Sequence, residues 1–209
     1  MIWRLTERKD WDSLVQQFSW VRDMDLVPQH ALHHAEGSVA VHTRMVLEAL
    51  QQQPSYLRLA EQDREILWAA ALLHDVEKRS TSVDEGNGQI TSKNHAKRGE
   101  ATVRTLLYRD ISTPFGIREH IASLVRHHGL PIWLMEREDP LKRACEASLR
   151  LDTSLLKQLA VADICGRICT DREILLEATE FFEMFCREQQ CWGKARAFAG
   201  DTARFHYFH

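Results

Sequence analysis

The sequence lacks several features that would place it in familiar classes of protein. No apolar run approaches the roughly 20 residues that a membrane-spanning helix needs, and residues 1–10 lack the apolar core of a signal peptide. Neither a GxxxxGK[ST] phosphate-binding loop nor a CxxC pair occurs in the 209 residues. These absences argue against a membrane protein, a secreted protein and a P-loop nucleotide site. We therefore expect a cytoplasmic protein without membrane contact.

Neither sign of charge dominates the chain, whose formal net charge is -3 and whose pI is about 6.4. Such a protein has no global field to hold nucleic acid or an anionic membrane, so any contact with nucleic acid requires a local basic patch. Hydrophobic residues make up 44% of the chain and charged residues 27%, which is ordinary for a globular protein. The length is enough for one domain with a sizeable core.

Cysteine is scarce, and its five positions follow no disulfide pattern. The odd count and the missing secretion signal predict reduced thiols. Cys165 and Cys169 are four residues apart and could share a helix face. We favour packing in the core over a zinc pair for these two thiols.

Strand-like alternation is also rare, whereas apolar residues recur at helical spacing along most of the chain. We therefore predict an all-α fold, a compact helical bundle. In the last helix, Ile174, Phe181 and Phe182 are expected to face inward. Residues 27–37 are expected to form a loop and residues 79–94 a loop or short irregular hairpin. The expected helices cover residues 10–20, 38–53, 64–75, 95–108, 117–128, 151–169 and 172–190.

Histidine and aspartate occur where the helical stripes predict buried faces. His74 and Asp75 directly follow the apolar stretch 67–73, and His128 extends the stripe of its helix whereas His127 does not. One such pair could simply be hydrogen bonded, but several from separate helices favour a shared cation. Mixed imidazole and carboxylate donors suit a divalent transition metal better than calcium. The full set is His42, His74, Asp75, His95, His128 and Asp163.

One or two ions in such a site could polarise a phosphoryl group and lower the pKa of water. Lys78, Arg79, Lys97 and Arg98 lie near the candidate ligands in sequence and could neutralise phosphate charge. The alternative for each is a solvated surface charge. The loop 27–37 contains His30, His33 and His34, which could contact substrate or remain solvated.

In chain order, His42, His74-Asp75 and Asp163 resemble the ligand pattern of the HD-domain metal-dependent phosphohydrolases. Segments 36–43, 74–78, 95–99 and 125–129 extend the resemblance, although Glu77 stands where glycine is common. The motifs look closest to the HD domain of bacterial tRNA nucleotidyltransferases (CCA-adding enzymes). They also resemble the HD modules fused to polynucleotide kinases in bacterial RNA-end repair. The resemblance covers about residues 36–166.

The resemblance implies that His42, His74, Asp75 and Asp163 hold a first metal. His95 and His128 would hold a second metal or the substrate phosphate. The implied activity is hydrolysis of phosphomonoesters or phosphodiesters of nucleotides or RNA ends, including 2′,3′-cyclic phosphates. The divalent metal would be Mn, Ni, Co, Mg, Zn or Fe. The expected catalytic residues are Asp75, Lys78, His95 and His128, and the expected substrate-binding residues are His34, Lys78, Arg79, Lys97, Arg98 and His127.

Two other functions remain open at this point. Some HD-fold proteins are oxygenases that use two irons, and others could be regulatory nucleotide-binding modules. We expect a single domain across residues 1–209 with its core at about 36–169. It could also be the N-terminal module of a longer protein, fused to a C-terminal kinase domain.

Overall fold

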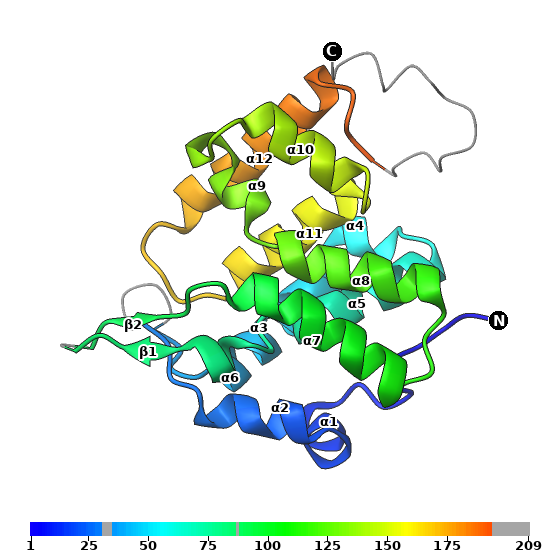
Figure 1. The fold of residues 1–209 in the computed structure, drawn as a ribbon, viewed down its shortest axis with the longest axis vertical. Coiled ribbons are helices and arrows are strands. Elements are labelled where there is room, and N and C mark those ends of the chain that lie inside the picture. Colours follow the sequence, from blue (N-terminus) through cyan, green and yellow to red (C-terminus); the bar gives the residue numbers. More distant parts are fainter. Residues whose placement is uncertain (31–34, 87, 194–209) are drawn as a thin grey trace.

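The computed structural model describes residues 1–30, 35–86 and 88–193. Helices dominate this part of the chain (Figure 1), which confirms the predicted all-α class. The strands found there are β1 (Val83–Asp84) and β2 (Ile90–Thr91), which pair antiparallel with Val83 opposite Thr91. They form the hairpin that was one alternative for residues 79–94. Within the described ranges, no helix combines the length and apolar character that crossing a membrane requires.

Helix α5 (Glu61–Leu73) lies at the centre of the bundle. It packs against α3 (Val39–Gln52), α8 (Phe115–His127) and α11 (Thr153–Cys165). Every residue from Glu65 to Leu73 is buried, so α5 is enclosed on all sides rather than along one stripe. The helix ends at Leu73 instead of the expected Asp75, and a turn follows.

Helices α3 and α11 approach each other closely where α11 ends. The side chains of Ser38 and Asp152 cap the first turns of α3 and α11, respectively. A Cβ atom at Gly166, the residue after α11, would lie 2.5 Å from Val46 Cγ2 and 2.7 Å from its backbone nitrogen. Only glycine fits this approach, which brings α3 against the end of α11.

Helices α7 (His95–Arg109) and α8 pack side by side, as the green helices in Figure 1 show. Gly99 is the point on α7 where another helix approaches the backbone closely. The neighbour is Val125 on α8, whose Cγ1 would lie 3.1 Å from a Cβ added at Gly99. This packing brings the start of α7 to the end of α8, and so brings His95 to His128.

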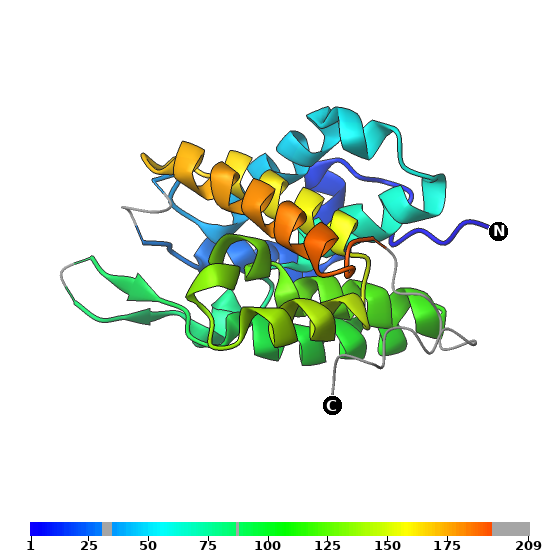
Figure 2. The same ribbon diagram turned by 90° about the horizontal axis from the view of Figure 1, so that it is seen from above.

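Helix α12 (Arg172–Glu188) lies beside α11, as Figure 2 shows, and also packs against α9 (Leu130–Trp133). The expected inward face of α12 is partly wrong, because Ile174 and Phe181 are 69% and 55% exposed. The buried stripe contains Leu175, Thr179, Phe182 and Cys186 instead. Two apolar stripes compete on this helix, and only the packing partner decides between them.

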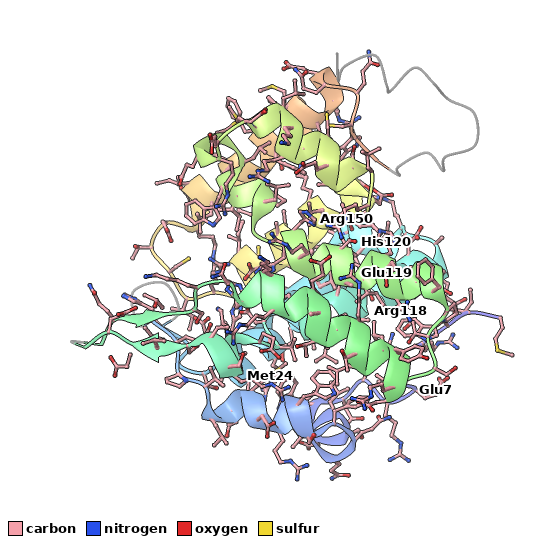
Figure 3. All side chains as sticks on the ribbon, viewed as in Figure 1. Glu7, Met24, Arg118, Glu119, His120 and Arg150 are labelled. Atoms are coloured by element: carbon pink, nitrogen blue, oxygen red, sulfur yellow. The ribbon has the colours of Figure 1, made fainter. Side chains whose placement is uncertain are left out.

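The remaining elements surround this centre. The helix expected at residues 10–20 is two helices, because Phe18 has an extended backbone. Met24 (Figure 3) is almost fully buried and belongs to the same core cluster as α5. Helix α10 was not predicted. These elements are α1 (Trp11–Gln17), α2 (Ser19–Asp23), η1 (Met24–Leu26), α4 (Pro54–Leu57), α6 (Lys78–Thr81), η2 (Leu134–Glu136) and α10 (Pro140–Ser148).

Candidate metal centre

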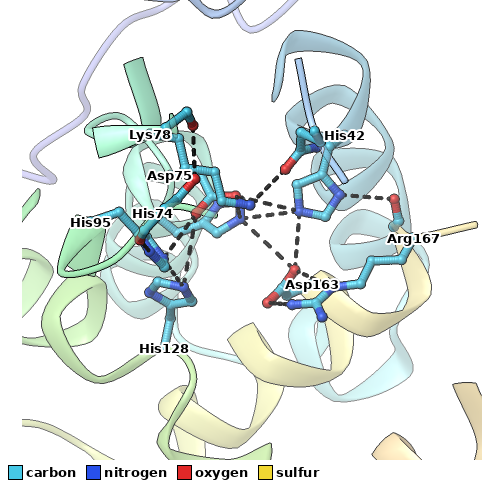
Figure 4. Close-up of polar contacts among 12 residues, drawn as sticks. His42, His74, Asp75, Lys78, His95, His128, Asp163 and Arg167 are labelled. Atoms are coloured by element: carbon cyan, nitrogen blue, oxygen red, sulfur yellow. Dashed lines mark hydrogen bonds and ion pairs between the residues drawn. The ribbon is translucent and has the colours of Figure 1, made fainter. Parts of the chain in front are cut away.

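The six side chains expected to hold metal lie together in two adjoining groups (Figure 4). We name His42, His74 and Asp163 the inner cluster, because all three are buried. His42 Nε2 lies 3.3 Å from His74 Nε2 and 3.1 Å from Asp163 Oδ1. These ligand atoms lie within 4.8 Å of one another, a spacing at which they could hold one ion.

The outer cluster contains Asp75, His95 and His128. His95 Nε2 lies 3.3 Å from His128 Nε2 and 3.4 Å from Asp75 Oδ1. The other carboxylate oxygen of Asp75, Oδ2, lies 3.3 Å from His74 Nε2 and 3.8 Å from His42 Nε2. Asp75 therefore faces both clusters, one oxygen toward each.

Helix ends and the core helices supply these side chains. His42 lies on α3 and Asp163 on α11, which the contact at Gly166 holds together. His74 is the C-cap of α5, and Asp75 lies in the turn that follows. At a helix end, successive residues no longer point 100° apart on a cylinder, so the turn can direct both side chains to one centre.

In three of the histidines, Nδ1 lies within hydrogen-bond distance of the backbone carbonyl oxygen three residues earlier. A carbonyl can only accept, so Nδ1 carries the proton and Nε2 keeps its lone pair. These lone pairs are directed to the two clusters. The Nδ1 to oxygen distances are 2.7 Å from His74 to Ala71, 2.8 Å from His95 to Ser92 and 2.8 Å from His128 to Val125.

His42 is oriented by one residue six positions earlier and by another 124 positions later in the sequence. Its Nδ1 lies 3.0 Å from Glu36 Oε1 and 3.2 Å from the carbonyl oxygen of Gly166. Both oxygens are acceptors, so Nε2 of His42 also points its lone pair at the inner cluster. The sequence did not assign a role to Glu36, which precedes the predicted helix, or to Gly166, which lies 124 residues from His42.

The donor geometry fits a cation. Within each cluster, the Nε2 atoms of two histidines lie 3.3 Å apart. In each of these histidines the ring proton is on Nδ1, which faces an oxygen acceptor. Two imidazole nitrogens on one ion at about 2.1 Å would be about 3.0–3.4 Å apart. Asp75 Oδ1 is buried and has no hydrogen-bond partner among the described residues. A shared cation would satisfy each of these atoms.

Positive neighbours keep both carboxylates ionised. Burial acts to raise the pKa of Asp75, but the charges of Lys78 and His74 outweigh it and hold the pKa well below its usual range. Burial acts in the same direction at Asp163, where Arg167 and His42 hold the pKa well below its usual range. Both groups are therefore anionic, as metal ligands must be.

The two clusters differ in how they bind protons. Burial acts to lower the pKa of His42, but hydrogen bonds to Asp163 and Glu36 outweigh it and raise the pKa. At His128, burial and the repulsion of His95 and His74 lower the pKa to about 3. His128 therefore stays neutral, with a lone pair on Nε2 available at any ordinary pH.

Each aspartate also has one basic partner. Lys78 Nζ donates to Asp75 Oδ2 at 2.8 Å and to Gln29 Oε1 at 2.6 Å. Arg167 donates through Nε to Asp163 Oδ1 at 3.0 Å and through Nη2 to Oδ2. Arg167 was missed in the sequence, although an aspartate and an arginine four residues apart beside an apolar helix face are a detectable signal.

A cavity of about 1220 Å³ opens beside the outer cluster, and Asp75, His95 and His128 form part of its wall. Of the expected substrate-binding residues, Lys78, Lys97 and His127 also line it.

Arg79 and Arg98 do not line this cavity: Arg79 pairs with Asp23 at 3.2 Å, and Arg98 is exposed. His34 lies outside the described residues. The role of each of these residues in binding stays a prediction.

Neither cluster contains a cysteine. Cys169 packs against the small apolar cluster around Ala160 and Ile164, in agreement with the packing interpretation.

Comparison with known proteins supports the same centre. No curated protein matches the chain closely. The family model described as "HD domain" matches residues 39–173, which is 135 of the 209 residues and includes all six residues of the two clusters. The chain therefore belongs to the HD-domain family, whose members are generally metal-dependent hydrolases.

Proposed function

We propose that the protein is a metal-dependent phosphohydrolase that cleaves phosphomonoesters or phosphodiesters of nucleotides or RNA ends, including 2′,3′-cyclic phosphates. The observation that carries the proposal is the convergence of two imidazole and carboxylate clusters on Asp75, beside a cavity lined by basic side chains. The similarity of the motifs to HD modules of CCA-adding enzymes and of RNA-end repair proteins supports this class of substrate.

In this proposal, His42, His74, Asp75 and Asp163 hold one divalent ion, and Asp75, His95 and His128 hold a second ion or the substrate phosphate. A divalent ion bound there would polarise the phosphoryl group and lower the pKa of water. The mixed nitrogen and oxygen donors favour Mn, Fe, Co, Ni or Zn over Mg, which prefers oxygen alone.

The protein's own residues position these donors. Lys78 contacts both Asp75 and Gln29, so its first role is to hold the carboxylate of Asp75. Arg167 does the same for Asp163. Lys97 is exposed on the cavity wall and makes no ion pair with any residue in the described ranges, so it can contact phosphate.

The donor set would also hold two irons, as in the oxygenases of this fold. Basic residues around the cavity favour an anionic phosphoester over a neutral substrate. Oxygen consumption by iron-loaded protein, without hydrolysis of any phosphoester, would favour the oxygenase instead.

The test is a panel of phosphomonoesters, phosphodiesters and 2′,3′-cyclic nucleotides, assayed with each divalent metal in turn. We expect metal-stimulated hydrolysis that Asp75→Ala abolishes. Lys142→Ala, which changes an exposed residue outside the cavity lining, serves as the control and should keep wild-type activity. Full activity of Asp75→Ala, or no hydrolysis with any metal, would overturn the proposal.

A further inference from the structure

The cavity extends beyond the metal centre to a segment that supplies no metal ligand. We infer that Trp133, Arg137, Arg143 and Arg150 form a distal subsite for the nucleotide next to the reacting phosphate. The preferred substrate is then the end of a single-stranded oligonucleotide rather than a mononucleotide. This inference rests on the proposed function and adds a substrate class to it.

The charge of the cavity wall is opposite to that of the whole protein. Seven lysines and arginines line the cavity, against three aspartates and glutamates, although the chain carries a formal net charge of -3. Lys78, Lys97, Arg126 and Arg167 each lie within four residues of a metal ligand, whereas Arg137, Arg143 and Arg150 do not. A basic groove on an acidic protein is the local patch that binding a polyanion requires.

The arginines of the distal subsite keep donors available. Arg137 makes no ion pair with any residue that the structure describes, and Arg143 has only a distant contact, 3.5 Å, with Glu146. Arg150 donates one Nη2 hydrogen bond to Glu100 at 2.8 Å; its place beside α8 is labelled in Figure 3. Since a guanidinium has five N–H donors, each of these residues can still bind a phosphate oxygen.

Trp133 supplies the second feature of the subsite. Within residues 132–135, only Ile132 and Leu134 are buried. Trp133 is 39% exposed and lines the cavity together with Leu130 and Leu149. An exposed indole beside arginines is a stacking surface for a nucleobase, which contributes about 1–3 kcal/mol per base.

The size of the cavity agrees with a substrate larger than one phosphate. Pockets for small molecules have volumes of about 300–1000 Å³, and this cavity has about 1220 Å³. A single phosphoryl group on the outer cluster would leave the wall formed by Trp133 and Arg143 without a contact. A neighbouring nucleotide would supply both a base for Trp133 and a phosphate for the arginines.

The experiment compares one mononucleotide with a four-nucleotide RNA that carries the same terminal phosphoester. For wild-type protein we expect KM to be about fivefold or more lower for the RNA, since one stacked base contributes at least about 1 kcal/mol. Trp133→Ala should raise KM for the RNA by about fivefold or more and should have a much smaller effect on kcat/KM for the mononucleotide. Trp133→Phe, which keeps an aromatic face, should restore most of the difference.

Binding provides a second readout that does not depend on turnover. We would measure the fluorescence anisotropy of a labelled RNA without the cleavable phosphate, at several salt concentrations. The double variant Arg137→Ala/Arg143→Ala should reduce the slope of log K against log salt by about 1.4, because each contact to a single strand contributes about 0.7. Lys142→Ala, beside Arg143 but outside the cavity lining, should leave the slope unchanged.

The outcomes separate this inference from the proposed function. Equal KM values for both substrates in the wild type would overturn the subsite while hydrolysis itself stands. Absence of hydrolysis for both would overturn the proposed function, and the anisotropy measurement would then decide the subsite alone. Equal RNA affinity in the wild type, Trp133→Ala and the double arginine variant would refute it.

Discussion

The inner and outer clusters present the same donor types but differ in access and support. The inner cluster is wholly buried, and its aspartate is paired with Arg167. In the outer cluster, the side chain of His95 is 24% exposed and forms part of the cavity wall. A buried site whose ligands are held by hydrogen bonds favours lasting retention of an ion. A more open site favours ion exchange and contact with substrate.

The clusters also differ in what orients their histidines. In the outer cluster, His95 and His128 are each fixed by a carbonyl three residues earlier, so their own helix ends are sufficient. In the inner cluster, His42 depends on Glu36 and on Gly166, and only the tertiary fold brings Gly166 close. The inner cluster should therefore be the more sensitive to changes in helix packing.

The largest effect is expected where the clusters meet. Asp75→Asn removes the one charged carboxylate that faces both clusters, so both should lose metal. We expect kcat/KM to fall by more than the roughly 100-fold caused by losing a residue that merely supports a ligand. Elemental analysis and kinetics on the same sample provide the measurement. Loss of metal from one cluster alone would show that Asp75 does not join them.

A matched pair of substitutions separates the two clusters. Asp163→Asn should abolish retention of the tightly held metal, because it removes the carboxylate that faces the inner cluster alone. His128→Gln should leave that metal in place and reduce turnover, since it alters only the outer cluster. Metal content after dialysis against a chelator is the readout. The comparison fails if His128→Gln loses as much retained metal as Asp163→Asn.

The basic partners of the aspartates provide a smaller test. Arg167→Met removes the guanidinium that holds the pKa of Asp163 low, so this pKa should rise toward its ordinary value. We expect about a 10–100-fold loss of affinity for the inner metal. Lys78→Met should have its main effect on the metal bound through Asp75. Titration calorimetry with a divalent metal would measure both. Unchanged metal affinity in Arg167→Met would contradict a positioning role.

The smallest effects come from three glycines. Gly166→Ala places Cβ against the backbone of Val46, so we expect a loss of about 1–3 kcal/mol in the free energy of unfolding and weaker inner metal binding. Gly99→Ala meets only the side chain of Val125 and should be milder. Gly116→Ala, on α8 with no atom within 4 Å, is the control and should be neutral or stabilising.

Thermal unfolding measures these three variants, at about 2–4 °C per kcal/mol for a chain of this size. A Gly166→Ala protein as stable as Gly116→Ala would show that α3 and α11 can separate without loss.

Much of the metal centre could be predicted from the sequence. Polar residues on apolar helix faces are conspicuous, so His42, His74 and Asp163 could be selected before any coordinates. The resemblance to HD domains is confirmed by the family match over residues 39–173. The finer likeness to CCA-adding enzymes and kinase-fused modules stays a prediction, as does the role of each ligand.

Periodicity along the sequence determined the helical class, because helices have a local repeat. It also identified the histidines and aspartates on apolar helix faces, which need a polar or metal partner when they are buried. Only the tertiary structure decided which face α12 buries, that Asp75 faces two clusters, and that the carbonyl oxygen of Gly166 orients His42 in the inner cluster. The physical reason is that these outcomes depend on contacts between residues far apart in the chain. A hydrogen bond across 124 residues, as between His42 and Gly166, leaves no local pattern to detect.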